Sequence, residues 1–456
     1  MNSRFRPRKL GSLVLPILLG AAFGLRFLVV LAYQPWSHYV LENRILLNDA
    51  YTYHYLALCI IHSHTFCGDT FRTPGYPSFI AILYSVFGEK PWVIIIAQGF
   101  VDVASIYLLY LIGRLVFSRR VGIVAALLLS IDPNAILATT NLWSDSLFVA
   151  VLLASFYMYL TGLIKLRGWA FLAAGALLGL AVLVRPVAQY YLVVLVICAL
   201  FWPAGRFAVR AQWIALLIFA FVLSLSPWMW RNYALYGTPK ISSIQGDNLL
   251  FWQVTYARAW EVNKPGAEVA REYKTAARAM GYSENGNPFV NEKITQRLAI
   301  QYIKTHPAIY ASRWINGIIH MYCNLNTTDI ATKLGFHSTP LEGDAIYVSE
   351  TQSKLIADFF RYKSVFEVVA GLVVLTLLLI NYLAFLLGTT LLIKDGRWAL
   401  TALMLLSIFY FSAVGGPISL ARFRLPVAPF YIVIGAFYID RVLCRLEHKD
   451  KHSDRH

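Results

Sequence analysis

The sequence predicts an all-α membrane protein with about ten spans and one polar domain on the side away from the cytoplasm. Hydrophobic residues make up 58% and charged residues only 14% of the 456 residues, whereas soluble globular chains average about 45–50% and about 25%. The apolar residues arrive in successive blocks of about 17–25, each long enough to cross a bilayer as a helix. Trp and Tyr gather near the ends of these blocks, where their polar edges suit the membrane interface.

The predicted spans follow one another along the chain. The first apolar block is expected to be retained, because it lacks the small-residue cleavage pattern of a signal peptide. We place the spans at 12–34, 91–117, 121–141, 144–165, 169–186, 187–203, 211–230, 363–393, 399–415 and 425–443. Within the third span, Asp132 is followed by Pro133 and is expected to mark a bend or a helix end.

The short loops that would face the cytoplasm are all basic when Met1 starts there. They carry Arg114, Arg119, Arg120, Lys165, Arg167, Arg206, Arg210, Lys394 and Arg397. This distribution follows the positive-inside rule, and it predicts that both termini are cytoplasmic. The net charge of +16 comes from basic residues scattered over these short loops. Membrane orientation and contact with anionic lipid account for such a distribution, so nucleic-acid binding is not indicated.

Three domains are predicted. Residues 1–230 form an N-terminal transmembrane module with a first outer loop at 35–91, residues 231–362 form an extracytoplasmic domain, and residues 363–456 form the C-terminal helices and a cytoplasmic tail. Residues 76–87 are apolar but short, which favours a re-entrant or interface helix. In the outer domain we expect short helices near 266–280 and 291–305, and an amphipathic helix over 307–322 on the membrane surface.

Five cysteines are present, without a CxxC motif or a Cys/His cluster of metal-ligand spacing. No metal site and no required cofactor are therefore predicted, although a divalent metal is compatible with the sequence. Cys59 and Cys67 share the first outer loop. A disulfide could persist there, and a pair of free thiols is the alternative.

The predicted first outer loop contains the polar residues that most strongly indicate a functional site. Asp49 and Tyr53 lie four residues apart and would share one face of a helix. Arg72 begins the segment Arg-Thr-Pro-Gly-Tyr-Pro, in which the prolines would present its guanidinium from a stiff turn. The structural alternatives are a helix cap for Asp49 and an interfacial anchor for Arg72.

Four more charged residues fall at the same outer edge. Asp145 begins a predicted span, where it could also cap the helix in competition with Ser144. Arg185, Arg422 and Arg424 stand outside against the positive-inside trend. A cation held at this depth usually has an anionic partner, either a carboxylate or a phosphate, with snorkelling to lipid headgroups as the alternative. Two carboxylates and four arginines at one depth predict a site.

The order of these motifs resembles glycosyltransferase family 39 of the GT-C superfamily, which includes bacterial relatives of protein O-mannosyltransferases and of the lipid A aminoarabinose transferase. The resemblance covers roughly residues 10–235 and 360–440 and fades in the outer domain. It implies a GT-C fold with about 10–12 transmembrane helices and an extracytoplasmic mixed or α-rich domain. It also implies a multi-pass protein of the bacterial cytoplasmic (inner) membrane with its active site on the outer face.

The resemblance implies roles for individual residues. Asp49 would be the catalytic base, Arg72 would contact the lipid-linked phosphate, and Asp145 would shape the acceptor side. The implied substrate-binding set is Tyr53, Arg72, Tyr76, Arg185, Arg422 and Arg424. Many relatives carry an acidic residue directly after the first Asp, whereas this chain has Ala50, which argues against a metal-dependent pair of carboxylates in the loop.

The implied reaction moves a sugar from a polyprenyl-phosphate donor to a glycan, lipid or protein acceptor on the outer face, with inversion at the anomeric carbon. No Gly-rich fingerprint of a nucleotide-binding fold is present, which disfavours a nucleotide-sugar donor. The rival from another class is a secondary transporter or flippase for a lipid-linked or anionic substrate. A polymerase or ligase of lipid-linked glycans is the remaining alternative.

Overall fold

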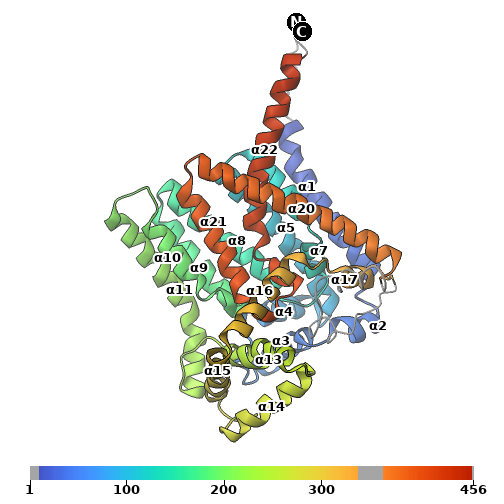
Figure 1. The fold of residues 1–456 in the computed structure, drawn as a ribbon, viewed down its shortest axis with the longest axis vertical. Coiled ribbons are helices and arrows are strands. Elements are labelled where there is room, and N and C mark those ends of the chain that lie inside the picture. The colour runs from blue at the N-terminus through green and yellow to red at the C-terminus, as the bar shows by residue number, and fades with distance from the viewer. Residues whose placement is uncertain (1–9, 337–362, 454–456) are drawn as a thin grey trace.

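A computed structural model describes residues 10–336 and 363–453 (Figure 1). Every regular element in these two ranges is helical, so the all-α fold class predicted from the sequence is confirmed. The end of the predicted outer domain, residues 337–362, lies outside the described residues.

The long and apolar helices come in two groups along the chain. They are α1 (Leu10–Tyr33), α5 (Pro91–Val116), α6 (Arg119–Ser130), α7 (Pro133–Thr139), α8 (Asp145–Lys165), α9 (Gly168–Val184), α10 (Tyr191–Leu200), α11 (Phe207–Tyr236), α20 (Val365–Lys394), α21 (Trp398–Val414) and α22 (Ala428–Ser453). Each of the ten predicted spans falls on one of these helices or on the α6–α7 pair.

The remaining elements are shorter. They are α2 (His38–Val40), η1 (Leu41–Ile45), α3 (Asp49–Ser63), α4 (Gly75–Phe87), η2 (Pro186–Ala188), α12 (Ile244–Asp247), η3 (Asn248–Val254), α13 (Thr255–Val262), α14 (Gly266–Ala279), α15 (Pro288–Thr305), α16 (Pro307–Cys323), α17 (Thr327–Lys333), η4 (Gly416–Ile418) and η5 (Ala421–Arg424). The helices expected near 266–280, 291–305 and 307–322 correspond to α14, α15 and α16.

Length separates the helices that can cross a bilayer alone from those that need neighbours. Five of the described helices are long and apolar enough to span a membrane, and α6 with α7 makes a sixth if the bent pair is one span. The helices α9 and α21, each of 17 residues, and α10 fall short of the roughly 20 residues that a perpendicular crossing requires. The count of ten spans therefore stays a prediction.

The apolar helices pack into one bundle. Helix α9 lies between α8 and α11, while α5 contacts α6 and α8, and α22 contacts α20 and α6. The start of α1 and the end of α22 lie together at one end of the molecule, and α13 to α15 lie at the opposite end (Figure 1).

Two of the predicted cytoplasmic loops, after α5 and after α20, lie beside the second half of α22. Arg120, in the first turn of α6, forms ion pairs with Asp440 and Glu447 of α22. Arg441 pairs with Asp395 of the α20–α21 connection at 2.9 Å. This clustering agrees with the positive-inside pattern, and the orientation itself stays a prediction.

The third predicted span is broken where the sequence suggested. Helices α6 and α7 meet at an angle of 60°, and the Asp132 side chain accepts a hydrogen bond from the N–H of Ala135 at 3.0 Å. Asp132 is thus the N-cap of α7, as expected of a bend residue. On the other side of the break, the carbonyl of Ser130 accepts a hydrogen bond from Arg26 at 2.8 Å.

Arg26 on α1 is almost completely buried, with 1% of its surface exposed. The sequence analysis did not identify it as a candidate residue. Its Nε donates to the carboxylate of Asp102 on α5 at 2.6 Å, and its Nη1 also donates to the carbonyl of Ala22. A charge inside an apolar bundle requires such partners because desolvation is costly. The pair therefore joins α1, α5 and the end of α6 at the broken span.

Helix α4 places the Arg72 turn against the membrane bundle. It contacts α3, α5 and α9, and its inner face buries Tyr76 and Ile80. At Gly75 a Cβ would lie 2.7 Å from the carbonyl oxygen of Leu183 on α9. Only glycine permits this approach, which brings the Arg72 turn beside the end of α9 where Arg185 follows.

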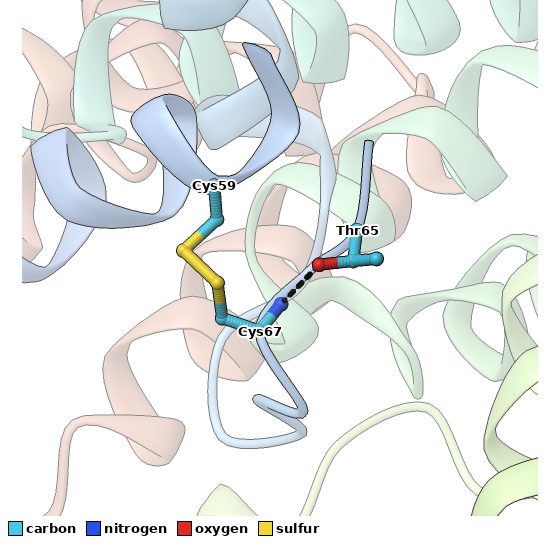
Figure 2. Close-up of a disulfide and its surroundings, with 3 residues drawn as sticks. All are labelled: Cys59, Thr65 and Cys67. Carbon is cyan, nitrogen blue, oxygen red and sulfur yellow. Dashed lines mark hydrogen bonds between the residues drawn. A yellow bond between two sulfur atoms is a disulfide. The ribbon is translucent and has the colours of Figure 1, made fainter. Parts of the chain in front are cut away.

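Cys59 and Cys67 form a disulfide with a Cα–Cα distance of 5.9 Å (Figure 2). The bond joins α3 to the loop that leads to the Arg72 turn, and Cys67 adopts a positive φ of 45°. The Cys67 N–H donates to the hydroxyl of Thr65 at 3.3 Å. Of the two alternatives left open by the sequence, the structure has the disulfide.

We expect loss of this disulfide to destabilise the protein moderately. Closing a loop of this length removes about 2.5 kcal/mol of unfolded-state entropy in the chain-entropy model. The Cys59→Ser/Cys67→Ser variant should therefore have a lower Tm than the native protein, measured in lipid nanodiscs. Cys323→Ser, which changes an exposed free cysteine, is the matched control. Titration of five free thiols in the unreduced native protein would contradict the prediction.

Candidate active site

A cavity of about 1290 Å³ lies between one end of the apolar helix bundle and the helices α12 to α15. Its inner wall comes from α3, the Arg72 turn, the start of α8, the segment after α9 and the segment around η5. Its outer wall comes from α12, η3, α13, α14 and α15. The charged residues that line it are Asp49, Arg72, Asp145, Arg185, Asp247, Arg271, Lys274 and Arg422.

Asp49 is the first residue of α3, and its carboxylate bridges two arginines that are distant in sequence. One oxygen accepts a hydrogen bond from Arg72 Nη2 at 2.6 Å, and the other accepts one from Arg422 Nη2 at 3.4 Å. The residue before it, Asn48, has φ of 49° and makes no side-chain capping bond. The Asp49 side chain therefore serves an ion cluster rather than a helix cap.

The Arg72 turn is shaped by groups that sequence reasoning missed. The carboxylate of Asp69 accepts hydrogen bonds from the N–H groups of Phe71 and Arg72, at 2.5 and 3.1 Å. The hydroxyl of Ser242, just after α11, donates to the carbonyl of Phe71 at 2.7 Å. Asp at position i with bonds to the following amides is a turn signature that the sequence does contain.

Burial raises the pKa of Asp69 above its ordinary value, more than the two amides and the neighbouring Arg72 lower it. Arg231 donates from Nη1 to the Asp69 carbonyl at 2.8 Å. The turn is thus fixed from both the first outer loop and the end of α11, which limits the positions that the Arg72 guanidinium can take.

Tyr53 and Tyr76 form an edge-to-face pair of rings next to Arg72. The Arg72 guanidinium carbon lies 5.1 Å from the centre of the Tyr53 ring, and Tyr53 packs edge-to-face on Tyr76 at 4.8 Å. Tyr76 is fully buried and donates from its hydroxyl to Gln98 Oε1 at 2.6 Å. Tyr53 lines the cavity, whereas Tyr76 lies behind it and does not.

Asp145 and Arg185 form a second ion pair on the same wall. Asp145 lies in the first turn of α8 and is 3% exposed, and Arg185 directly follows α9. Ser144 occupies the N-cap position but makes no side-chain capping bond. The pair is oriented by aromatic neighbours, since Arg185 lies 5.9 Å from the Phe148 ring and 6.0 Å from the Phe423 ring.

Arg422 and Arg424 have different surroundings although they are two residues apart. Arg422 lines the cavity, pairs with Asp49 and lies 4.8 Å from the Trp143 ring. Arg424 is 2% exposed, and its Nη1 donates to the carbonyls of Met321, Tyr322 and Asn324 at 2.9, 3.1 and 3.3 Å. Arg424 therefore holds the end of α16, away from the cavity.

The charges of the cavity favour an anionic ligand. Five cations and three carboxylates line it, which leaves an excess of positive charge. Burial raises the pKa of Asp49, but the guanidiniums of Arg72 and Arg422 outweigh it and hold the pKa below its usual value, so the carboxylate is ionised at neutral pH. Within the described part of the chain the Nε–H groups of both arginines are buried without a partner, so Asp49 does not use all of their donors.

Metal binding is not supported by the described part of the chain. Within residues 10–336 and 363–453 no group of three His, Cys, Asp or Glu side chains has the spacing to hold a metal ion. The two carboxylates of the inner wall form ion pairs with arginines instead.

Comparisons with known proteins bear on the fold that carries this cavity. The sequence profile of a family described as dolichyl-phosphate-mannose-protein mannosyltransferase matches residues 72–230. The apo structure of the oligosaccharyltransferase from Archaeoglobus fulgidus superposes on 100% of this chain and 53% of its own, with a TM-score of 0.54 at 14% identity. The chain has the GT-C fold. The GT-C resemblance expected from the motifs is thereby confirmed.

Two further structures are similar to this GT-C chain. Oligosaccharyltransferase AglB from Archaeoglobus fulgidus, in complex with an inhibitory peptide and a dolichol-phosphate, has a TM-score of 0.52 at 14% identity and covers 96% of this chain and 52% of its own. ArnT from Cupriavidus metallidurans bound to undecaprenyl phosphate has a TM-score of 0.41 at 16% identity and covers 93% and 77%. No curated protein sequence matches the chain. The chain spans about half the length of the oligosaccharyltransferase chains.

Proposed function

We propose that this protein is a glycosyltransferase that moves a sugar from a polyprenyl-phosphate donor to an acceptor on the extracytoplasmic face of a bacterial inner membrane. The observation that supports this most is the Asp49 carboxylate held between Arg72 and Arg422 on the wall of a large cavity in a GT-C fold. The cavity lies at the end of the bundle opposite the basic loops, which supports an outer-face site with both termini in the cytoplasm.

A lipid-linked phosphate suits the inner wall. The excess of cations on the cavity lining, with Arg72 and Arg422 beside each other at Asp49, can bind a phosphate. The outer ends of membrane helices form this wall, so an isoprenoid tail could remain in the bilayer. The GT-C neighbour AglB was solved with a dolichol-phosphate, which supports a donor of the same chemical class.

The proposed reaction needs few protein groups. The acceptor hydroxyl oxygen forms a bond to the anomeric carbon as its proton passes to the Asp49 carboxylate. The bond between the anomeric carbon and the phosphate oxygen breaks, and polyprenyl phosphate leaves as a monoester with one more negative charge. Arg72, Arg422 and Arg185 stabilise that charge where little water competes. Attack opposite the leaving group inverts the anomeric carbon.

The proposal is tested by donor consumption. Purified protein in lipid nanodiscs is incubated with a panel of polyprenyl-phosphate sugars and with an extract of the source cell envelope as the acceptor supply. We expect release of polyprenyl phosphate from one donor and an inverted anomeric centre in the product. If no donor of the panel is consumed in the presence of the extract, the transferase proposal fails.

The pH dependence of the reaction follows from the ion cluster. Because the pKa of Asp49 lies below its ordinary value of about 4, the base stays deprotonated as the pH falls from 8 to 5. We expect kcat/KM for donor consumption, which reports the free enzyme, to show no loss from Asp49 protonation over this range. A decline with a midpoint between pH 5.5 and 7 that disappears in Asp49→Asn would contradict this assignment.

A transporter or flippase is the second candidate, because Arg26 and Asp102 are charged residues inside the apolar bundle. Their pairing with each other and with helix-end carbonyls supports a structural role instead. Movement of a fluorescent polyprenyl phosphate across proteoliposomes, without any acceptor and without loss of the sugar, would favour this candidate.

A further inference from the structure

The outer wall of the cavity carries three side-chain amides. Gln245 on α12, Asn248 on η3 and Gln296 on α15 all line the cavity and are half-buried. Among the described residues, no side-chain amide of these three makes a hydrogen bond. An amide offers two N–H donors and a carbonyl acceptor, so three free amides on one wall can bind several groups that both donate and accept.

Asp247 adds an acceptor to the same wall. Its Oδ1 is buried and has no hydrogen-bond partner within the described chain. Burial raises the pKa of this carboxyl more than the Thr295 hydroxyl lowers it, and the nearby carboxylate of Glu292 raises it further. A buried oxygen without a partner is costly, and a ligand that donates a hydrogen bond to it would remove that cost.

The position of Asp247 depends on a close contact between α12 and α15. At Gly246 a Cβ would lie 2.3 Å from the carbonyl oxygen of Glu292 and 2.4 Å from the hydroxyl of Thr295. No larger residue fits without moving α15. Glycine therefore brings Asp247 beside the turn of α15 that carries Gln296.

Aromatic rings complete the wall. Tyr256 and Tyr282 line the cavity, and Tyr282 packs edge-to-face on Phe251 at 6.3 Å. Burial raises the pKa of the Tyr282 hydroxyl, and the charge of Asp247, which lines the same cavity, raises it further. An apolar ring face next to free amides and a carboxylate suits a molecule with apolar C–H faces and a rim of hydroxyls.

We propose that this outer wall is the acceptor subsite and that the acceptor is a carbohydrate, bound by Gln245, Asp247, Asn248 and Gln296 and covered by Tyr256 and Tyr282. This inference rests on the proposed function, because the acceptor hydroxyl must face Asp49 across the cavity. Each sugar hydroxyl is both donor and acceptor, as are the amides. A free glycan and a glycolipid headgroup share this chemistry.

Binding tests the subsite without requiring turnover. Saturation-transfer NMR is measured in nanodiscs free of glycosidic detergent, with the methyl glycosides of glucose, galactose, mannose and N-acetylglucosamine as probes. We expect signals from at least one glycoside. Asp247→Asn and Gln296→Leu should each weaken its affinity about tenfold, which corresponds to about 1.4 kcal/mol. Gln301→Leu, an exposed position on α15 outside the cavity lining, is the matched control.

The outcomes separate this inference from the proposed function. Lack of binding by all four glycosides, or equal binding by Gln296→Leu and the native protein at equal Tm, would overturn the subsite. In the donor-consumption assay, Gln296→Leu should raise the acceptor KM and leave the donor KM unchanged. If an unglycosylated peptide or lipid from the extract is the substance modified, the carbohydrate assignment is wrong although the transferase proposal stands.

The productive glycoside is then compared free and with a hexadecyl aglycone inserted in the nanodisc. Preference for the lipid-anchored form identifies a glycolipid headgroup as the source, and equal use of both forms identifies a soluble glycan. Both results support the subsite.

Discussion

Replacement of Asp49 by Asn should lower the rate of donor consumption by about 10²–10⁴-fold, the usual contribution of a general base. The substitution removes the proton acceptor while keeping the shape of the side chain. It also removes the anion that pairs with Arg72 and Arg422, so the two guanidiniums become fully available to the donor phosphate. We therefore expect donor binding to be unchanged or tighter while kcat falls, and this combination distinguishes a base from a residue that only organises the site.

The measurement is donor binding by fluorescence together with release of polyprenyl phosphate under single-turnover conditions. Asp145→Asn is the matched variant, because Asp145 lines the same wall but pairs with Arg185. If Asp49→Asn consumes the donor as fast as the native protein and Asp145→Asn does not, the base has been assigned to the wrong carboxylate. Weaker donor binding in Asp49→Asn would contradict the competition between Asp49 and the phosphate.

Replacement of Arg26 by Leu should cost about 3–5 kcal/mol of stability, the usual effect of removing one partner of a buried ion pair. Asp102 would be left as a buried carboxylate, and the carbonyl of Ser130 at the break between α6 and α7 would lose a donor. We expect little folded protein, or a strongly reduced Tm in nanodiscs, although the residue lies outside the cavity lining.

The double variant Arg26→Leu/Asp102→Leu provides the control for this effect. Removing both charges avoids the uncompensated carboxylate, so part of the stability should return. The carbonyls of Ala22 and Ser130 would still lack their donor, so recovery should be incomplete. A single Arg26→Leu variant with the Tm of the native protein would show that this buried pair does not hold the broken span.

The sequence predicted the helices well, because an apolar block long enough to cross a bilayer must satisfy its backbone hydrogen bonds internally, and a helix does so. The bend at Asp132 was also predictable, since an Asp before a proline ends one helix and caps the next. The spans predicted at 169–186 and 399–415 agree with α9 and α21 to within two residues. Only α10 is clearly shorter than its predicted span of 187–203, because the separate turn η2 occupies the start of that apolar block.

The sequence predicted which residues come together at the candidate site better than it predicted the directions of their side chains. The structure brings together Asp49, Arg72, Asp145, Arg185 and Arg422 on one cavity, and the predicted topology had placed all five at one depth. Tyr76 and Arg424 share those motifs but face the protein interior, because side-chain direction depends on packing that sequence does not reveal. Asp69 carried a readable turn signal.

The pair of Arg26 and Asp102 was missed although each is an isolated charge inside an apolar block, and such charges need a partner. The outer wall of the cavity carried no readable signal, because its glutamines and tyrosines are ordinary residues until α12 and α15 are folded together.

The bridge made by Asp49 joins the beginning and the end of the polypeptide, since its two arginines are 23 and 373 residues away. During synthesis, Arg72 enters the membrane region early, whereas Arg422 arrives only after α20 and α21 have been inserted. Throughout that interval the carboxylate has a single cationic neighbour and the cavity lacks its last wall. A chain that is truncated or stalled before Arg422 therefore lacks both the second arginine and the cavity wall around η5, so the cavity is completed only when insertion is nearly finished.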